Sequence, residues 1–292
     1  MNKLANLNFN LGKKFGKNKT DSLVFQSLLN GEDITLDVCS FEEVLPYSLL
    51  AIPISTITTH DNVWIASSML SRISDVTNNL VVIEDEFPIG TISTFEIIDG
   101  LQKNPTSAFF SENITKIMNP DFYIDSPTVN ISAILGRMGK SKNPFTVIQN
   151  DRTSFSQFSI RQALEIGALC KTNLNASSFE QKRIPRFSRD DTISDIIARL
   201  KKDQSEFALL ENEYSFVNYD IILEKLKELH NTESDELLSL SASTLKTITP
   251  MLISEKQSLS EMCKIMLNAK SPCVMTKDRI ITARDILDVL CK

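Results

Sequence analysis

The sequence predicts an α/β (α+β) fold of four tandem units, each running strand, helix, strand, strand, helix. A proline recurs at intervals of 67, 65 and 65 residues, and an amphipathic helix pattern follows each one. A strand–turn–strand pattern and a second helix then close each unit. The recurring prolines are Pro53, Pro120, Pro185 and Pro250.

The first helix of each unit has apolar residues at helical spacing, which is typical of a helix with one buried stripe. These helices are predicted within residues 63–70, 129–138, 193–200 and 259–267. Short apolar runs follow and end in polar turns, which is the pattern of a β-hairpin. The first hairpin strands are predicted at residues 80–83, 145–148, 207–210 and 273–275.

A closing helix follows each hairpin, and its first turn provides a landmark independent of the prolines. The leading residues are spaced 63, 61 and 65 apart, so both landmarks give the same period. We expect these helices to be led by Glu96, Ser159, Asp220 and Asp285.

The predicted units span about residues 50–105, 112–170, 179–230 and 244–292. Because a unit of roughly sixty residues buries its sheet poorly alone, we expect neighbouring units to pair. The polar linker at 170–178 predicts one pair over 50–170 and a second over 179–292. Residues 1–20 are predicted to form a flexible basic tail, and residues 21–49 a lead-in segment.

Composition limits the classes of protein that this chain can represent. The 292 residues carry a formal net charge of −6, which disfavours a phosphate backbone as the main partner. The five cysteines are widely spread without a C-x-x-C pair, as in proteins of a reducing cytoplasm. No signal peptide or spanning segment is visible, so a soluble cytoplasmic protein without a membrane partner is expected.

The order of elements, the unit length and the pattern Thr282-Ala283-Arg284-Asp285 together resemble CBS domains, named after cystathionine beta-synthase. Such units pair as Bateman modules and often bind adenine nucleotides. The four-unit layout over residues 50–292 is similar to that of the gamma subunit of AMP-activated protein kinase. The resemblance implies two Bateman modules and a ligand containing adenosine, namely AMP, ADP, ATP or S-adenosylmethionine.

The T-x-x-D pattern suits this ligand chemically. The start of a helix presents unpaired backbone N–H groups to phosphate, and an ionised carboxylate accepts hydrogen bonds from ribose hydroxyls. Within the resemblance, Asp285 holds the ribose, and Thr282 and Arg284 contact the ribose-phosphate region. The strand around Pro272 and Cys273 then contacts the base. The same spacing is also that of a capping box, which any helix can use.

The other units keep this pattern less completely. Unit one has Ser93 and Glu96, and unit three has Asp220 with Val217 where the hydroxyl is expected. Unit two has Ser156 and Ser159 at these positions and no acid, which argues against ribose binding there. We therefore expect one or two functional ligand sites, with unit four as the best.

The leading hypothesis is a non-enzymatic regulatory protein that passes ligand occupancy to a protein partner. No nucleophile–base pair, catalytic cofactor motif or metal-ligand spacing is found in the sequence. An alternative is an interaction scaffold with vestigial ligand pockets. A weaker alternative is nucleic-acid binding through the basic tail. Self-association as a homodimer is left open by the sequence.

Overall fold

The computed structural model describes residues 8–9, 40, 52–73, 77–141, 143–228, 237–269, 271–277 and 279–290. The predicted basic tail and lead-in segment therefore lie outside the described residues, except for residues 8–9 and 40. The dipeptide β1 (Asn8–Phe9) pairs in antiparallel orientation with β8 (Cys170–Lys171), which follows the second repeat.

Each of the four predicted sequence units, called repeats one to four from here on, contains one three-stranded sheet with the same topology. The first hairpin strand is central; it is parallel to the strand that opens the repeat and antiparallel to the second hairpin strand. The strands, repeat by repeat, are β2 (Thr56–Thr58), β3 (Asn79–Glu84) and β4 (Phe87–Ser93); β5 (Ile124–Asp125), β6 (Phe145–Gln149) and β7 (Phe155–Ser159); β9 (Arg186–Phe187), β10 (Phe207–Leu210) and β11 (Phe216–Asn218); β12 (Met251–Leu252), β13 (Cys273–Met275) and β14 (Ile280–Thr282).

Two helices accompany each sheet, one before the hairpin and one after it, which confirms the predicted order of elements. The opening helices are α4 (Val63–Ile73), α6 (Ile131–Lys140), α8 (Ile193–Lys202) and α10 (Leu259–Ala269). The closing helices are α5 (Thr94–Lys103), α7 (Ile160–Leu169), α9 (Tyr219–Glu228) and α11 (Ala283–Leu290). Among the described residues, no helix has both the length and the apolar character needed to cross a membrane.

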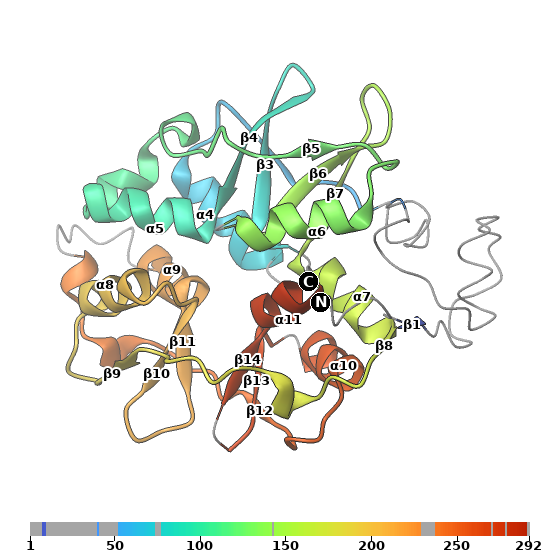
Figure 1. The fold of residues 1–292 in the computed structure, drawn as a ribbon. Helices are drawn as coiled ribbons and strands as arrows, with labels where there is room; N and C mark the ends of the chain where they lie inside the picture. The colour runs from blue at the N-terminus through green and yellow to red at the C-terminus, as the bar shows by residue number, and fades with distance from the viewer. Residues whose placement is uncertain are drawn as a thin grey trace. The chain divides into compact units, whose positions relative to one another are not determined.

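The chain forms two compact units, each built from alternate repeats (Figure 1). The one–three unit comprises residues 55–121 and 182–250, and the two–four unit comprises residues 1–54, 122–181 and 251–292. Each unit has its own apolar core, to which both of its repeats contribute.

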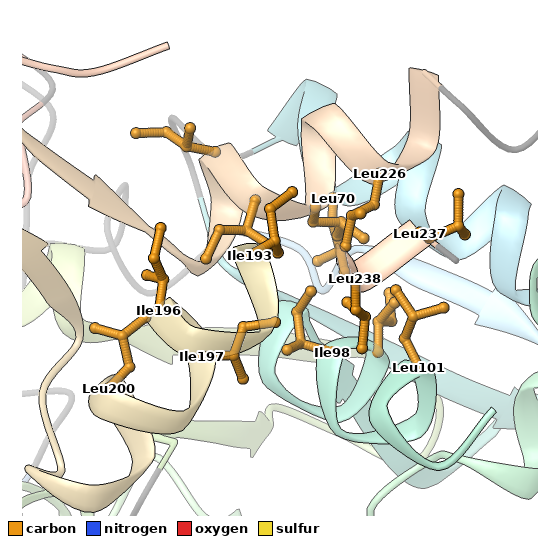
Figure 2. Packing of buried hydrophobic residues seen from close by; sticks show 14 of the residues in the cluster. Leu70, Ile98, Leu101, Ile193, Ile196, Ile197, Leu200, Leu226, Leu237 and Leu238 are labelled. Carbon is orange, nitrogen blue, oxygen red and sulfur yellow. The ribbon is translucent and has the colours of Figure 1, made fainter. Parts of the chain in front are cut away.

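The apolar stripe of α8 contributes to the core of the one–three unit. Ile193, Ile196, Ile197 and Leu200 are all fully buried, at the spacing of one helix face. Figure 2 shows this stripe together with other members of the same cluster, including Leu70 of α4 and Leu101 of α5. Four isoleucine or leucine side chains at this spacing give α8 its place in the core, because each removes a large apolar surface from water.

The core of the two–four unit depends on a close approach of α7 to α10 and α11. A Cβ atom at Gly167 of α7 would lie 2.6 Å from the Sγ atom of Cys263 on α10, so a larger residue there would push the helices apart. Cys170 and Cys263 are both buried as free thiols, and burial raises the pKa of Cys263 to about 12. These thiols therefore stay protonated and fill the core as small apolar side chains.

The cores group the repeats differently from the predicted consecutive pairs. Apolar helix stripes of repeat one pack with those of repeat three, and those of repeat two pack with those of repeat four. Proximity in sequence was the basis of the prediction, whereas the apolar stripes join across the intervening repeat. The consecutive modules at 50–170 and 179–292 stay a prediction.

Candidate functional site

The end of β14 and the start of α11 place Thr282 and Asp285 against each other. Oδ2 of Asp285 accepts a hydrogen bond from the backbone N–H of Thr282 at 2.8 Å, and Oγ1 of Thr282 accepts one from the backbone N–H of Asp285 at 3.0 Å. The Asp285 side chain is buried, with 7% of its surface exposed. The predicted hydroxyl and carboxylate thus lie together at a helix N-terminus, in capping-box geometry.

The other predicted residues of repeat four lie close by in sequence but face different neighbours. Arg284 donates a hydrogen bond from Nη2 to the carbonyl oxygen of Gly139 at 2.7 Å, and its Nε lies 3.8 Å from Oδ1 of Asp288. Cys273 is fully buried in β13, and the Pro272 carbonyl accepts the backbone N–H of Ala283 at 2.9 Å. Arg284 therefore links repeat four to repeat two.

Repeat one uses its hydroxyl and carboxylate for the same helix cap. The backbone N–H of Ser93 donates to Oε2 of Glu96 at 2.8 Å, and the Ser93 hydroxyl donates to the same oxygen. Burial raises the pKa of Glu96 above its ordinary value, although the Ser93 hydrogen bonds oppose this change. Ser93 and Glu96 are thus brought together, as the sequence predicted for either a cap or a ligand clamp.

The carboxylate of Asp220 in repeat three accepts a hydrogen bond from a side chain of repeat one, within the one–three unit. Its Oδ1 accepts the hydroxyl of Thr94, from repeat one, at 2.6 Å, and its Oδ2 accepts Nδ2 of Asn218 at 3.2 Å. Burial raises the pKa of Asp220, while these two hydrogen bonds oppose the increase. Next to this contact, the rings of Phe95 and Tyr219 meet edge to face with centroids 5.9 Å apart.

Strand register shows that the motif alignment in repeats two and three was wrong. The residue that ends the second hairpin strand pairs with the first residue of β3, β6, β10 or β13. This residue is Ser93, Ser159, Asn218 and Thr282 in repeats one to four. The hydroxyl position of repeat two is therefore Ser159 rather than Ser156, and that of repeat three is Asn218 rather than Val217.

The acid position of the motif shifts accordingly. It is Gln162 in repeat two, whose Oε1 accepts the Ser159 backbone N–H at 2.8 Å and the Ser159 hydroxyl at 2.6 Å. In repeat three it is Ile221, whose backbone N–H donates to Oδ1 of Asn218 at 3.0 Å. Asp220 thus lies one residue before the position that Glu96 and Asp285 occupy.

Sequence reasoning missed Gln162 because it looked for an acid after the first serine. The signal that could have found it is the pair Ser159-x-x-Gln162, which is itself a capping box and starts the apolar pattern of α7.

Known proteins resemble this chain in their structure and not in their sequence. No family model matches the chain, and no curated protein matches it by sequence. A solved structure from Methanocaldococcus jannaschii, described as a candidate archaeal homologue of g-AMPK, matches with a TM-score of 0.71 and 13% identity. The match covers 86% of this chain and 99% of that one.

Two other solved structures are less similar. An uncharacterized conserved protein from Pyrococcus horikoshii matches with a TM-score of 0.49 and 11% identity, over 82% of this chain and 95% of its own. A CBS-domain protein from Agrobacterium tumefaciens matches with a TM-score of 0.36 and 9% identity, over 39% of this chain and 84% of its own.

The repeated sheet, the two helices of each repeat and the Methanocaldococcus match define the class of fold. The chain has the four-repeat CBS fold, and it matches the Methanocaldococcus structure over 86% of its length. This confirms the resemblance that the sequence indicated.

Proposed function

We propose that this protein is a regulatory sensor that binds an adenosine-containing ligand at repeat four and transmits occupancy to a protein partner. The observation that carries the proposal is the buried carboxylate of Asp285 beside Thr282, at the start of α11. A carboxylate at this place accepts hydrogen bonds from a vicinal diol, such as that of ribose, while the helix N-terminus favours a negatively charged group.

Each of the five predicted site residues of repeat four has a role in this proposal. Asp285 accepts the ribose hydroxyls, the Thr282 hydroxyl contacts the ribose-phosphate region, and the strand at Pro272 and Cys273 lies beside the base. Arg284 is the phosphate partner, and it exchanges its bond to the Gly139 carbonyl for the ligand. That exchange would couple ligand binding to the packing of repeat two, because Gly139 belongs to α6.

The M. jannaschii protein supports the choice of ligand class, since its description links the same fold to g-AMPK. AMP, ADP, ATP and S-adenosylmethionine all carry the adenosine group that this site is proposed to bind. The regulatory, non-catalytic role and the cytoplasmic location belong to the same proposal.

The test is thermal unfolding with each of these four ligands. At a hundred times the dissociation constant, a ligand stabilises the folded state by about 2.7 kcal/mol, which is a shift of several degrees. The Asp285→Ala variant should lose this shift. Glu261→Ala is the matched control, because Glu261 closes a similar capping box with Ser258 on α10 but lies on the surface.

Loss of the shift in both variants would show that a weakened cap, not a lost ligand contact, is responsible. Retention of the full shift in Asp285→Ala would contradict the proposal.

A second candidate is an interaction scaffold that takes no ligand. It is favoured by the one–three unit, in which Glu96 bonds Ser93 and Asp220 bonds Thr94. The wild-type protein would then show no shift with any of the four ligands and would still co-purify with a stable partner.

A further inference from the structure

An arginine in repeat four holds the segment that follows repeat two. Nη1 of Arg279 donates hydrogen bonds to two backbone carbonyls, that of Ser177 at 3.1 Å and that of Phe179 at 2.6 Å. Arg279 directly precedes β14, so these bonds join the hairpin of repeat four to a segment 100 to 102 positions earlier in the chain. Because a charged donor makes stronger hydrogen bonds than a neutral one, this contact fixes the segment firmly.

The held segment is the start of the connection between the two units. The backbone N–H of Ser177 donates to the carbonyl of Glu255, which precedes α10, at 3.0 Å. Phe179 is 7% exposed and belongs to the core of the two–four unit. Residues 180–183 are all exposed, and the one–three unit resumes at residue 182. Arg279 therefore holds this connection at the point where the chain leaves the two–four core.

Arg279 also faces a covered carboxylate. Its Nε lies 3.4 Å from Oε2 of Glu255, and the two side chains form an ion pair. Although 39% of the Glu255 side chain is exposed, both carboxylate oxygens are covered and make no hydrogen bond to any residue that the structure describes. A covered charge is costly without a partner, so loss of Arg279 would leave Glu255 unbalanced. The ion pair and the carbonyl bonds must therefore be separated by experiment.

The corresponding position in the other three repeats holds a small residue. Strand register places Gly90, Ser156 and Ser215 where repeat four has Arg279. Glycine has no side chain, and the two serine hydroxyls bond to side chains of their own hairpins. The contact is thus special to the repeat with the proposed ligand site.

The strand β14 links this contact to the junction with α11. The strand contains only three residues, and it ends at Thr282, which shares a helix cap with Asp285. A short paired strand shifts as one piece, because its pairing with β13 fixes each residue relative to the next. A displacement at Thr282 is therefore passed to Arg279 at the other end.

We propose that Arg279 couples the strand–helix junction of Thr282 and Asp285 to the connection between the two units. The inference rests on the proposed function only in that this junction is where the ligand is proposed to bind. Arg279 is thus a positioning residue, through which a change at repeat four reaches the chain that leads to the one–three unit.

Hydrogen exchange of the ligand-free full chain tests the contact. The amides of Ala176 and Ser177 report on the held segment, because they donate to carbonyls of the loop before α10. Arg279→Met, which keeps an unbranched side chain without a donor, should make them exchange about tenfold faster relative to the amides of α7 in the same protein. Unchanged exchange would overturn the inference.

Arg189→Met is the matched control. Arg189 also pairs with a glutamate, Glu213, at 3.1 Å, but this pair lies on the surface of repeat three. The control variant should therefore leave the exchange of Ala176 and Ser177 unchanged.

Arg279→Met combined with Glu255→Gln removes both charges of the ion pair and tests the carbonyl bonds alone. Exchange should stay about tenfold faster than in wild type, because the carbonyls of Ser177 and Phe179 still lack their donor. A return to the wild-type rate would show that an unbalanced Glu255 is responsible, and it would overturn the role of the carbonyl bonds.

Coupling requires that the two sites do not act independently. Asp285→Ala should speed the exchange of the two amides about threefold when Arg279 is present and leave it unchanged in the Arg279→Met background. The same change in both backgrounds, or none in either, would overturn the inference. All of these measurements are made without ligand, so their outcome is distinguishable from that of the thermal-shift test of the proposed function.

Discussion

The first turns of the closing helices have different neighbours in the two units. In the one–three unit these turns bond directly to each other, through Thr94 with Asp220 and through the rings of Phe95 and Tyr219. In the two–four unit the second residue of each closing helix is an arginine. Arg161 and Arg284 each lie near an acid one turn later on the same helix.

This difference bears on where the proposed ligand site lies. The acid of Asp220 is committed to a bond between repeats one and three. The acid of Asp285 accepts the backbone N–H of Thr282 in its own strand–helix junction. Carboxylates at nearly equivalent helix positions thus have different neighbours, which is why we place the proposed ligand site in the two–four unit.

The largest effect is expected from opening a cavity in each core. Ile197→Ala in the one–three core and Ile286→Ala in the two–four core should each lower the free energy of unfolding by about 2 to 5 kcal/mol, since both side chains are fully buried. Urea denaturation measures the loss, and hydrogen exchange locates it. Faster exchange confined to α8 and α9 in Ile197→Ala, and to α7 and α10 in Ile286→Ala, would show that the two cores unfold separately. Equally faster exchange in both units would contradict this separation.

A smaller effect is expected from the bond between Thr94 and Asp220. Thr94→Val keeps the shape of the side chain but leaves a carboxylate oxygen without its donor, which should cost about 1 to 3 kcal/mol. Thermal or urea unfolding measures this change. Thr115→Val is the control, because the Thr115 hydroxyl also donates to a side chain, Asn113, but lies exposed. Equal costs for the two variants would show that the bond between repeats adds no stability.

The finest test is the pH dependence of stability. Because the pKa of Asp220 in the folded state is raised above its ordinary value of 3.8, its contribution to stability is fully present below that value. The contribution is lost as the pH rises through the raised pKa. Wild type should therefore lose stability relative to Asp220→Asn as the pH is raised from just under 4.

Asp195 provides a control of opposite sign in the same unit. The Thr192 hydroxyl lowers the pKa of Asp195, so the stability from Asp195 is lost as the pH falls. Relative to Asp195→Asn, wild type should lose stability on acidification below about pH 4. Melting temperatures measured across this range check both signs, and the same sign for both variants would contradict the assignment.

Much of the fold was predictable because each repeat carries local signals. Short apolar runs and amphipathic stripes identified the strands and helices, and the observed β10 and β13 have the predicted bounds. Thr282 and Asp285 were also predictable, because a hydroxyl and an acid three residues apart meet within one helix turn.

The motif positions in repeats two and three were not predictable from spacing. Ser156 and Ser159 both precede an apolar stretch and can each cap a helix, so local preference does not choose between them. The choice depends on strand pairing, in which Ser159 lies opposite Phe145. A hydrogen-bonded register is a property of two strands and is therefore not encoded in either one alone.

The sequence by itself determined the four repeats, their order of elements and the chemistry available at each helix start. Only the tertiary structure decided which repeats share a core and which acid bonds across a unit. The physical reason is range: turns, caps and amphipathic stripes arise between residues a few positions apart. The bond of Thr94 to Asp220 joins residues 126 positions apart, and only the packed helices bring them together.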